Sequence, residues 1–330
     1  MEISDSTSIS LVYLLIGSLL LYFGAEGLVR GSSSIAFRFG IRPLVIGLTL
    51  VAFGTSSPEL AVSMSAALDG NSGISAGNVI GSNICNIALI IGVAALIRPI
   101  EIDLKVIRTD ISIMVGVTIL TIVLIIDGEI SFFDGIILTI GIIVYNVATI
   151  YFAKKNGVSE DYQNFVKSRK KKYLDIALLI LGLVGVLLGA NVFLVGAEGI
   201  AVKLGASEAL IGLTIVAFGT SLPELATSVV ASIKDEGDIS IGNAIGSNVF
   251  NLLCILGLTA LVMPIDTSGI SYADLGIMLV VSVLIIPMAF TKKRLSRLEG
   301  AILLFIYILY IAYLFLTHYS VHGIIEVFLK

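Results

Sequence analysis

The chain has 330 residues, of which 57% are hydrophobic and only 13% are charged, and its mean hydropathy is +1.06. A soluble domain carries about 25% charged residues, so this composition excludes a soluble globular protein and predicts an all-α integral membrane protein. The net charge of −4 identifies no charged partner, and the two cysteines lie in apolar runs, where a disulfide or metal role is not expected.

Long apolar runs recur along the chain, and a helix needs about 20 apolar residues to cross a bilayer. The first run follows acidic residues and is longer than the apolar part of a signal peptide, so it is predicted to stay in the mature protein. Ten transmembrane helices are predicted, at residues 10–37, 43–68, 74–97, 107–126, 131–153, 174–203, 209–233, 239–263, 270–290 and 297–316.

Only one connection is polar over a long stretch, the lysine-rich segment 154–173. It separates a first five-helix repeat (1–153) from a second (174–330). Because five is odd, the second half enters the membrane from the opposite side, so the repeats are predicted to be inverted. Basic residues favour the cytoplasmic side. Placing the linker there puts 18 of the 20 Lys and Arg residues inside and both termini outside a cell membrane.

The two halves match each other at an offset of 165 residues. Residues 46–63 and 211–228 are identical at 15 of 18 positions, and the register continues without a gap over residues 24–86 and 189–251. A match of this length indicates an internal duplication.

The first repeated motif, Gly-Thr-Ser-x-Pro-Glu, places one glutamate in each half, Glu59 and Glu224, inside an otherwise apolar span. A carboxylate at membrane depth is costly and indicates a functional site; the alternative is a protonated pair that joins helices. Proline lacks an N–H and clashes with the carbonyl four residues earlier. Each span should therefore kink here, leaving the backbone carbonyls near Ala52, Gly54 and Thr55, and those near Ala217 in the second half, without partners.

Hydroxyl groups accompany each glutamate. Thr55 and Ser56 precede Glu59 by four and three residues, so the three side chains are predicted to share one helical face. Thr220 and Ser221 stand in the same relation to the second glutamate.

The second motif, Gly-Asn-x-x-Gly-Ser-Asn, opens the third and eighth spans. It brings Ser82 and Asn86, and again Ser247 and Asn251, onto one helical face at a spacing of four. Ligation is the favoured interpretation of these side chains, and hydrogen bonding between membrane helices is the alternative. The motif glycines are better explained by close helix packing.

Both motifs together supply carboxylates, hydroxyls, amides and backbone carbonyls, the oxygen ligands preferred by Ca²⁺ and comparable hard cations. Nitrogen and sulfur ligands are missing, which disfavours Zn²⁺, Cu and Fe. The spans contain no histidine to activate a serine, and the chain has no phosphate-binding Gly-Lys-Ser loop. We therefore expect a transporter rather than an enzyme, with no cofactor and no nucleotide or nucleic-acid partner, acting as a monomer in the lipid bilayer.

The paired motifs in two five-span halves resemble the α-repeats of sodium/calcium exchangers, which belong to the calcium/cation antiporter superfamily. The resemblance implies four cation sites between the second, third, seventh and eighth helices. It implies that Ca²⁺ is bound by the side chains of Glu59 and Glu224 and the carbonyls of Thr55 and Thr220. For Na⁺ it implies Ser56, Ser82, Ser221, Ser247 and the carbonyls of Ala52 and Ala217, with Asn86 and Asn251 lining the centre.

Two positions refine the resemblance. Potassium-dependent relatives depend on an aspartate where this chain has Asn251, which favours potassium-independent exchange. The proton-coupled branch carries an acid where this chain has Gly81 and Gly246, which weakens a Ca²⁺/H⁺ interpretation.

Charge counting then predicts the stoichiometry. Two ionised glutamates give an empty site a charge of −2, which one Ca²⁺ neutralises and three Na⁺ convert to +1. We expect electrogenic exchange of three Na⁺ for one Ca²⁺, with alternating access through movement of the first and sixth spans. A Ca²⁺/H⁺ or other cation/H⁺ antiporter, a cation channel and a non-transporting scaffold are the alternatives.

Overall fold

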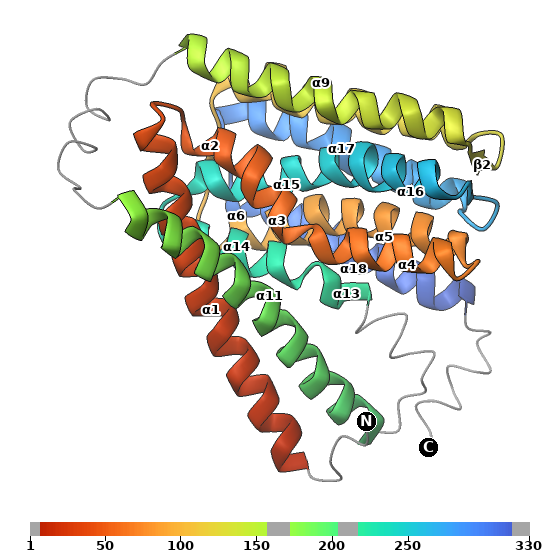
Figure 1. Ribbon diagram of the computed structural model, residues 1–330, viewed down its shortest axis with the longest axis horizontal. Helices are drawn as coiled ribbons and strands as arrows, with labels where there is room; N and C mark the ends of the chain where they lie inside the picture. Colours follow the sequence, from red (N-terminus) through yellow and green to blue (C-terminus); the bar gives the residue numbers. More distant parts are fainter. Residues whose placement is uncertain (1–6, 157–171, 204–216, 319–330) are drawn as a thin grey trace.

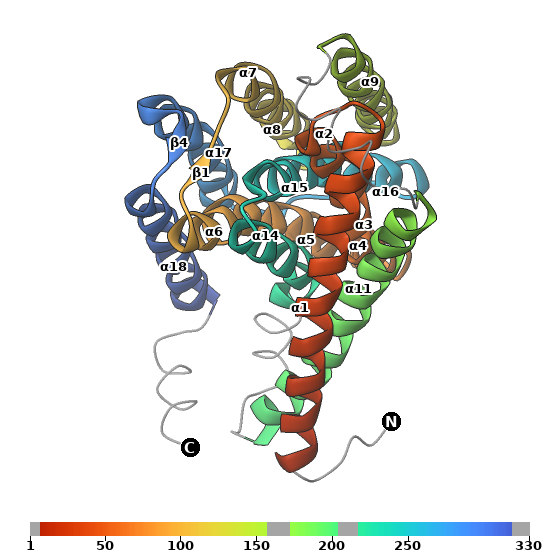
Figure 2. The same cartoon turned by 90° about the vertical axis from the view of Figure 1, so that its left-hand side faces the viewer.

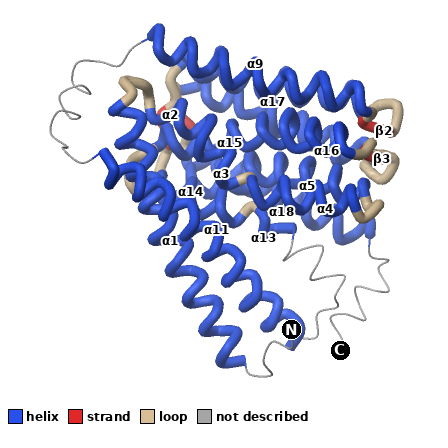
Figure 3. Tube along the Cα trace, viewed as in Figure 1, coloured by secondary structure: helices blue, strands red, loops and turns tan. Residues whose placement is uncertain are grey.

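The computed structural model describes residues 7–156, 172–203 and 217–318, and almost all of them are helical (Figures 1 and 3). The first half contains α1 (Thr7–Arg38), α2 (Pro43–Ile46), η1 (Gly47–Val51), α3 (Ala52–Thr55), α4 (Ser57–Leu68), α5 (Ser72–Ile84), η2 (Cys85–Ile91), α6 (Gly92–Ile97), β1 (Ile100–Glu101), α7 (Leu104–Val106), η3 (Ile107–Ile111), α8 (Ser112–Ile125), β2 (Glu129–Ile130) and α9 (Phe132–Asn156). The second contains α11 (Lys172–Lys203), α13 (Ala217–Thr220), α14 (Leu222–Ile233), α15 (Gly237–Phe250), η5 (Asn251–Ile255), α16 (Leu256–Val262), β3 (Ile265–Asp266), α17 (Tyr272–Lys292), β4 (Arg294–Leu295) and α18 (Arg297–His318). The η segments are π-helical turns.

Among the described residues, eight helices are long and apolar enough to cross a membrane, and a bent pair, Pro43–Thr55 with Ser57–Leu68, makes a ninth. Each coincides with a predicted span, so the prediction of an all-helical membrane protein is confirmed. The remaining predicted span, 209–233, is described only from Ala217 onward. Its helix α14 has 12 residues, too few to cross a bilayer alone, and the number ten therefore stays a prediction.

Two short antiparallel sheets join the halves at opposite ends of the helix bundle (Figures 2 and 3). In one sheet Ile100 of β1 lies opposite Leu295 of β4, and in the other Ile130 of β2 lies opposite Ile265 of β3. Adding 165 to positions 100 and 130 gives 265 and 295, so each pairing is the counterpart of the other. The correspondence between the halves thus extends beyond the segments whose residues match.

α1 and α11 lie side by side and antiparallel, and they diverge from the rest of the bundle (Figures 1 and 2). Glycines repeat every seven residues along their interface, and a Cβ placed on Gly24 or Gly31 would lie 2.5 Å from the backbone N of Val186 or Leu179. Only glycine allows two helix backbones to approach so closely. The two helices therefore pack as one tight unit.

The centre of the bundle is formed by two helical segments, Ser72–Ile97 and Gly237–Val262. Their most apolar windows are 72% and 83% buried, against at most 39% for the other continuous spans. Gly242 and Gly246 pack against backbone atoms of Leu44, Gly47 and Leu48, which confirms the predicted packing role of the motif glycines in the second half. In the first half the equivalent neighbours, 209–216, lie outside the described residues.

Candidate cation site

The second span breaks at the first motif. α3 ends at Thr55, α4 begins at Ser57, and the two parts are inclined at 44°. Pro58 causes the break because it cannot donate to the carbonyl of Gly54; the Ser57 hydroxyl donates to that carbonyl instead, at 2.6 Å.

The sequence predicted that the break leaves several backbone carbonyls without hydrogen-bond partners, and one of these carbonyls keeps its partner. The Ser56 amide donates to the Ala52 carbonyl at 3.0 Å, so the expectation that Ala52 loses its partner is wrong. The ordinary helical bond survives because the proline lies two residues further on. The Thr55 hydroxyl also lies 3.4 Å from the Ala52 carbonyl oxygen, so two donors already neighbour this oxygen.

The second half breaks at the equivalent point, between α13 and α14. Here the Ser221 amide donates to the Phe218 carbonyl at 3.2 Å, which is a tighter turn than in the first half. Ala217 begins α13, and the helical turn before it lies outside the described residues.

The serine of the first motif in each half donates a hydrogen bond to the glutamate of the other half. Ser56 donates to Oε1 of Glu224 at 2.7 Å, and Ser221 donates to Oε1 of Glu59 at 3.2 Å. Each motif serine thus donates to the glutamate of the other half, and the prediction that the serine and glutamate of one half share a helical face stays a prediction. The consequence is that carboxylates from both halves belong to one cluster.

The serines of the second motif complete this cluster. Ser247 donates to Oε1 of Glu224 at 3.5 Å, and the Ser221 and Ser82 hydroxyls lie 3.4 Å apart. The six side chains thus form two hydrogen-bonded groups, Ser56–Glu224–Ser247 and Glu59–Ser221–Ser82, each with residues from both halves. The two groups lie next to each other at the first break, where Ser56 and Glu59 are three residues apart.

Both glutamates are buried, each with 1% of its surface exposed. The second carboxylate oxygen of each, Oε2, has no hydrogen-bond partner among the described residues. A buried polar atom without a partner is costly, and a buried unpaired charge costs more. A cation between the two acids would remove both penalties.

The predicted asparagines lie at two central π-helical turns. Asn86 is the second residue of η2, and Asn251 is the first residue of η5. A π-helical turn is wider than an α-helical turn and is frequent at functional sites. The Asn86 amide donates to Oδ1 of Asn248 at 3.0 Å. Asn251 is fully buried, and neither polar atom of its side chain has a partner in the described part of the chain.

Two further asparagines hold the backbone of the glutamates. Asn78 donates to the Glu59 carbonyl at 3.2 Å, and Asn243 donates to the Glu224 carbonyl at 3.3 Å. Both residues belong to the second motif, but the sequence alone predicted no role for them. Their presence in both copies was the available signal, but spacing alone could not show that they reach the preceding helix. Thr55 joins the same network, since its hydroxyl lies 3.1 Å from Oδ1 of Asn243, and Thr220 is buried close to the break.

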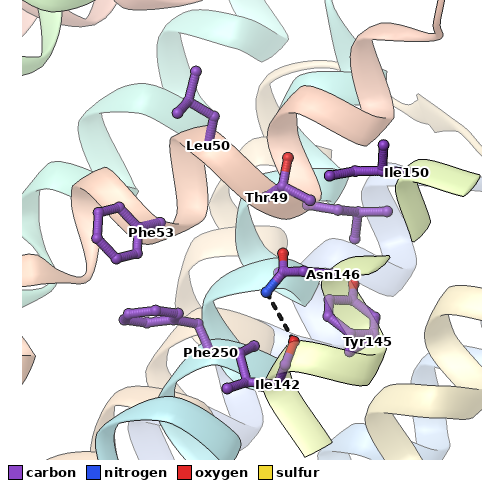
Figure 4. A pocket seen from close by; sticks show the side chains of 10 residues that line it. Thr49, Leu50, Phe53, Ile142, Tyr145, Asn146, Ile150 and Phe250 are labelled. Carbon is purple, nitrogen blue, oxygen red and sulfur yellow. Dashed lines mark hydrogen bonds between the residues drawn. The ribbon is translucent and has the colours of Figure 1, made fainter. Parts of the chain in front are cut away.

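A cavity of about 280 Å³ lies elsewhere, between α9, α15 and the segment of η1 and α3 (Figure 4). Phe53 and Phe250, in edge-to-face contact at 5.2 Å, form part of its wall. The lining has no carboxylate and includes none of the predicted site residues, so this cavity is not the cation site.

Comparisons with known proteins show what the whole chain is similar to. The family model described as sodium/calcium exchanger protein matches residues 9–151 and 174–316. The sodium/calcium exchanger MaX1 of Methanosarcina acetivorans is 32% identical, covering 93% of this chain and 99% of that protein. The putative antiporter CaxA of Alkalimonas amylolytica is 36% identical over 92% of this chain and 97% of its own. A solved structure of the sodium-calcium exchanger NCX_Mj, soaked with Na⁺ and Ca²⁺, superposes with a TM-score of 0.82 at 37% identity, covering 92% of this chain and 98% of that one.

Proposed function

Because the chain belongs to the sodium/calcium exchanger family, we propose that it exchanges Na⁺ for Ca²⁺ across the membrane at the cluster of two glutamates and four serines. The crossed pairs Ser56–Glu224 and Ser221–Glu59 carry this proposal. They make one binding site out of two halves, so a single ion can contact carboxylates from both.

The two carboxylates are proposed to bind Ca²⁺ together with the carbonyls of Thr55 and Thr220. Ca²⁺ takes six to eight oxygen ligands at about 2.3–2.6 Å, and the unpartnered Oε2 atoms are the strongest of those available. Na⁺ is proposed to occupy flanking positions bounded by Ser56, Ser82, Ser221, Ser247 and the carbonyls of Ala52 and Ala217, with Asn86 and Asn251 lining the centre.

The proposed stoichiometry is three Na⁺ for one Ca²⁺, independent of K⁺. No lysine or arginine forms an ion pair with either glutamate among the described residues, so no basic side chain offsets the charge of −2 that the two carboxylates carry when both are ionised. The amide at Asn251, in place of an acid, supports independence from K⁺.

We further propose ten spans in two inverted halves of five, residues 1–153 and 174–330, joined by a cytoplasmic linker at 154–173 with both termini outside. Support comes from the paired sheets β1–β4 and β2–β3, which are counterparts at opposite ends of the bundle. The chain is expected to act as a monomer.

Alternating access is proposed to occur by movement of the tight α1–α11 unit against the bundle. α1 packs along α14 far more extensively than its counterpart α11 packs along α4. Glu26 of α1 also forms a 2.7 Å ion pair with Lys234, just after α14. The counterpart positions, Asn191 and Asp69, cannot form that ion pair. These differences support a structure closed at the cytoplasmic end.

Purified protein in liposomes tests the proposal. An outward Na⁺ gradient is expected to drive ⁴⁵Ca²⁺ uptake, and replacing K⁺ by choline on both sides should leave the rate unchanged. Uptake driven by a pH gradient and indifferent to Na⁺ would instead identify a cation/H⁺ antiporter. Passive flux far above transporter turnover would identify a channel, and the absence of flux would indicate a scaffold.

A further inference from the structure

We propose that Asn78 and Asn243 are positioning residues that orient the two glutamates so that their carboxylates converge on one Ca²⁺. The inference rests on the proposed Na⁺/Ca²⁺ exchange. It concerns two side chains that touch the backbone of the binding site and are not themselves assigned to any ion.

Each amide makes the same two bonds in its own half. Nδ2 of Asn78 donates to the Glu59 carbonyl at 3.2 Å and to the Ser63 hydroxyl at 2.9 Å. Nδ2 of Asn243 donates to the Glu224 carbonyl at 3.3 Å and to the Ser228 hydroxyl at 3.1 Å. The duplicated geometry shows that this contact is part of the motif and is not an incidental feature of one half.

The place of these bonds explains what they do. Glu59 and Glu224 lie in the first turn of α4 and α14, directly after the break. The first turn after each break lacks one backbone hydrogen bond of a continuous helix, because its proline has no N–H to donate. The serine four residues after each glutamate lies on the same face, and binding both groups to one amide fixes that face toward the neighbouring central helix.

Asn243 also connects the two halves. Its Oδ1 lies 3.1 Å from the Thr55 hydroxyl, which is equally close to the carbonyl of Val51 in its own helix. The next residue, Ser56, donates to the Glu224 carboxylate at 2.7 Å. Two consecutive residues of the first half therefore contact the surroundings of Glu224. Thr55 contacts Asn243, which binds the Glu224 backbone, and Ser56 binds the Glu224 side chain. Asn243 is fully buried, whereas Asn78 is partly exposed, and the larger effect is expected at Asn243.

Loss of this orientation should affect the two ions differently. Ca²⁺ is proposed to need both carboxylates at once, whereas the flanking Na⁺ positions are bounded mainly by serines. Asn243→Ala is therefore expected to raise the Ca²⁺ concentration for half-maximal uptake about tenfold, as loss of two buried hydrogen bonds would. The Na⁺ concentration for half-maximal exchange should change by less than about threefold, since at most one bond to its ligands is weakened.

The experiment compares Asn243→Ala, Asn78→Ala and wild type by Na⁺-driven ⁴⁵Ca²⁺ uptake in proteoliposomes. Asn146→Ala is the matched control, because within the described part of the chain that amide donates only to the Ile142 carbonyl of its own helix, at 2.9 Å; wild-type values are expected. Ser228→Ala keeps the asparagine and removes one acceptor, so it reports on the same contact even if Asn243→Ala does not fold. It should shift the Ca²⁺ value in the same direction by about threefold.

The outcomes separate the two proposals. Absence of Na⁺-driven uptake by the wild type would overturn the proposed function and this inference together. If the wild type exchanges ions but Asn243→Ala and Ser228→Ala lower only the maximal rate, with the ratio of Ca²⁺ to Na⁺ half-saturation unchanged, the asparagines are merely structural. The inference alone would then be wrong.

Discussion

Replacing Glu224 with glutamine is expected to lower Na⁺-driven Ca²⁺ uptake about 30-fold or more, because removing one charge of a buried, hydrogen-bonded charged cluster costs about 2–5 kcal/mol. The amide has the shape of the carboxylate and can still accept from Ser56, so the change isolates the charge. With −1 instead of −2, the site no longer neutralises one Ca²⁺. Initial rates of ⁴⁵Ca²⁺ uptake in proteoliposomes measure the effect.

Glu59→Gln should have a comparable effect, because the two glutamates are counterparts with the same burial. Glu129→Gln is the matched control: this exposed glutamate lies in β2, remote from the cluster, and its variant should transport like the wild type. Wild-type uptake by either site variant would show that one carboxylate is dispensable and would contradict the shared site.

Membrane potential should shift the equilibrium Ca²⁺ gradient strongly. If three Na⁺ exchange for one Ca²⁺, one net charge crosses the membrane per cycle. Moving that charge is worth about 2.3 kcal/mol per 100 mV, which changes the equilibrium Ca²⁺ ratio about 50-fold. An inside-negative potential should therefore favour Ca²⁺ extrusion.

The shift can be measured as the Na⁺ gradient at which net ⁴⁵Ca²⁺ flux vanishes in liposomes clamped at two potentials with valinomycin. Control liposomes without protein report the leak. A null gradient that does not move with potential would indicate two Na⁺ per Ca²⁺, and the charge argument from the two glutamates would then fail.

The duplicated motifs made much of the fold predictable. The match between residues 24–86 and 189–251, at an offset of 165, predicted two related halves. The same offset relates the pairing of Ile100 with Leu295 to that of Ile130 with Ile265. Apolar runs located nine spans because burial in lipid demands continuous helices. The number ten could not be tested, since residues 204–216 lie outside the described part of the chain.

The connections within the site were harder to predict. Spacing shows which side chains share a face of a straight helix, but it cannot give the direction in which a broken helix continues. Ser56 was therefore predicted only to lie on the helical face of Glu59, whereas its hydroxyl donates to Glu224 in the other half. The contact of Asn243 with the Glu224 carbonyl depends on how two helices pack, which no local pattern contains.

Equilibrium ⁴⁵Ca²⁺ binding to purified protein tests most directly whether Glu59 and Glu224 hold one ion between them. We predict one Ca²⁺ per wild-type chain, displaced by Na⁺ with a Hill coefficient above about 2, as expected when several Na⁺ replace one ion, and no measurable binding to Glu59→Gln or Glu224→Gln. Two Ca²⁺ per chain, or wild-type affinity in either variant, would contradict it.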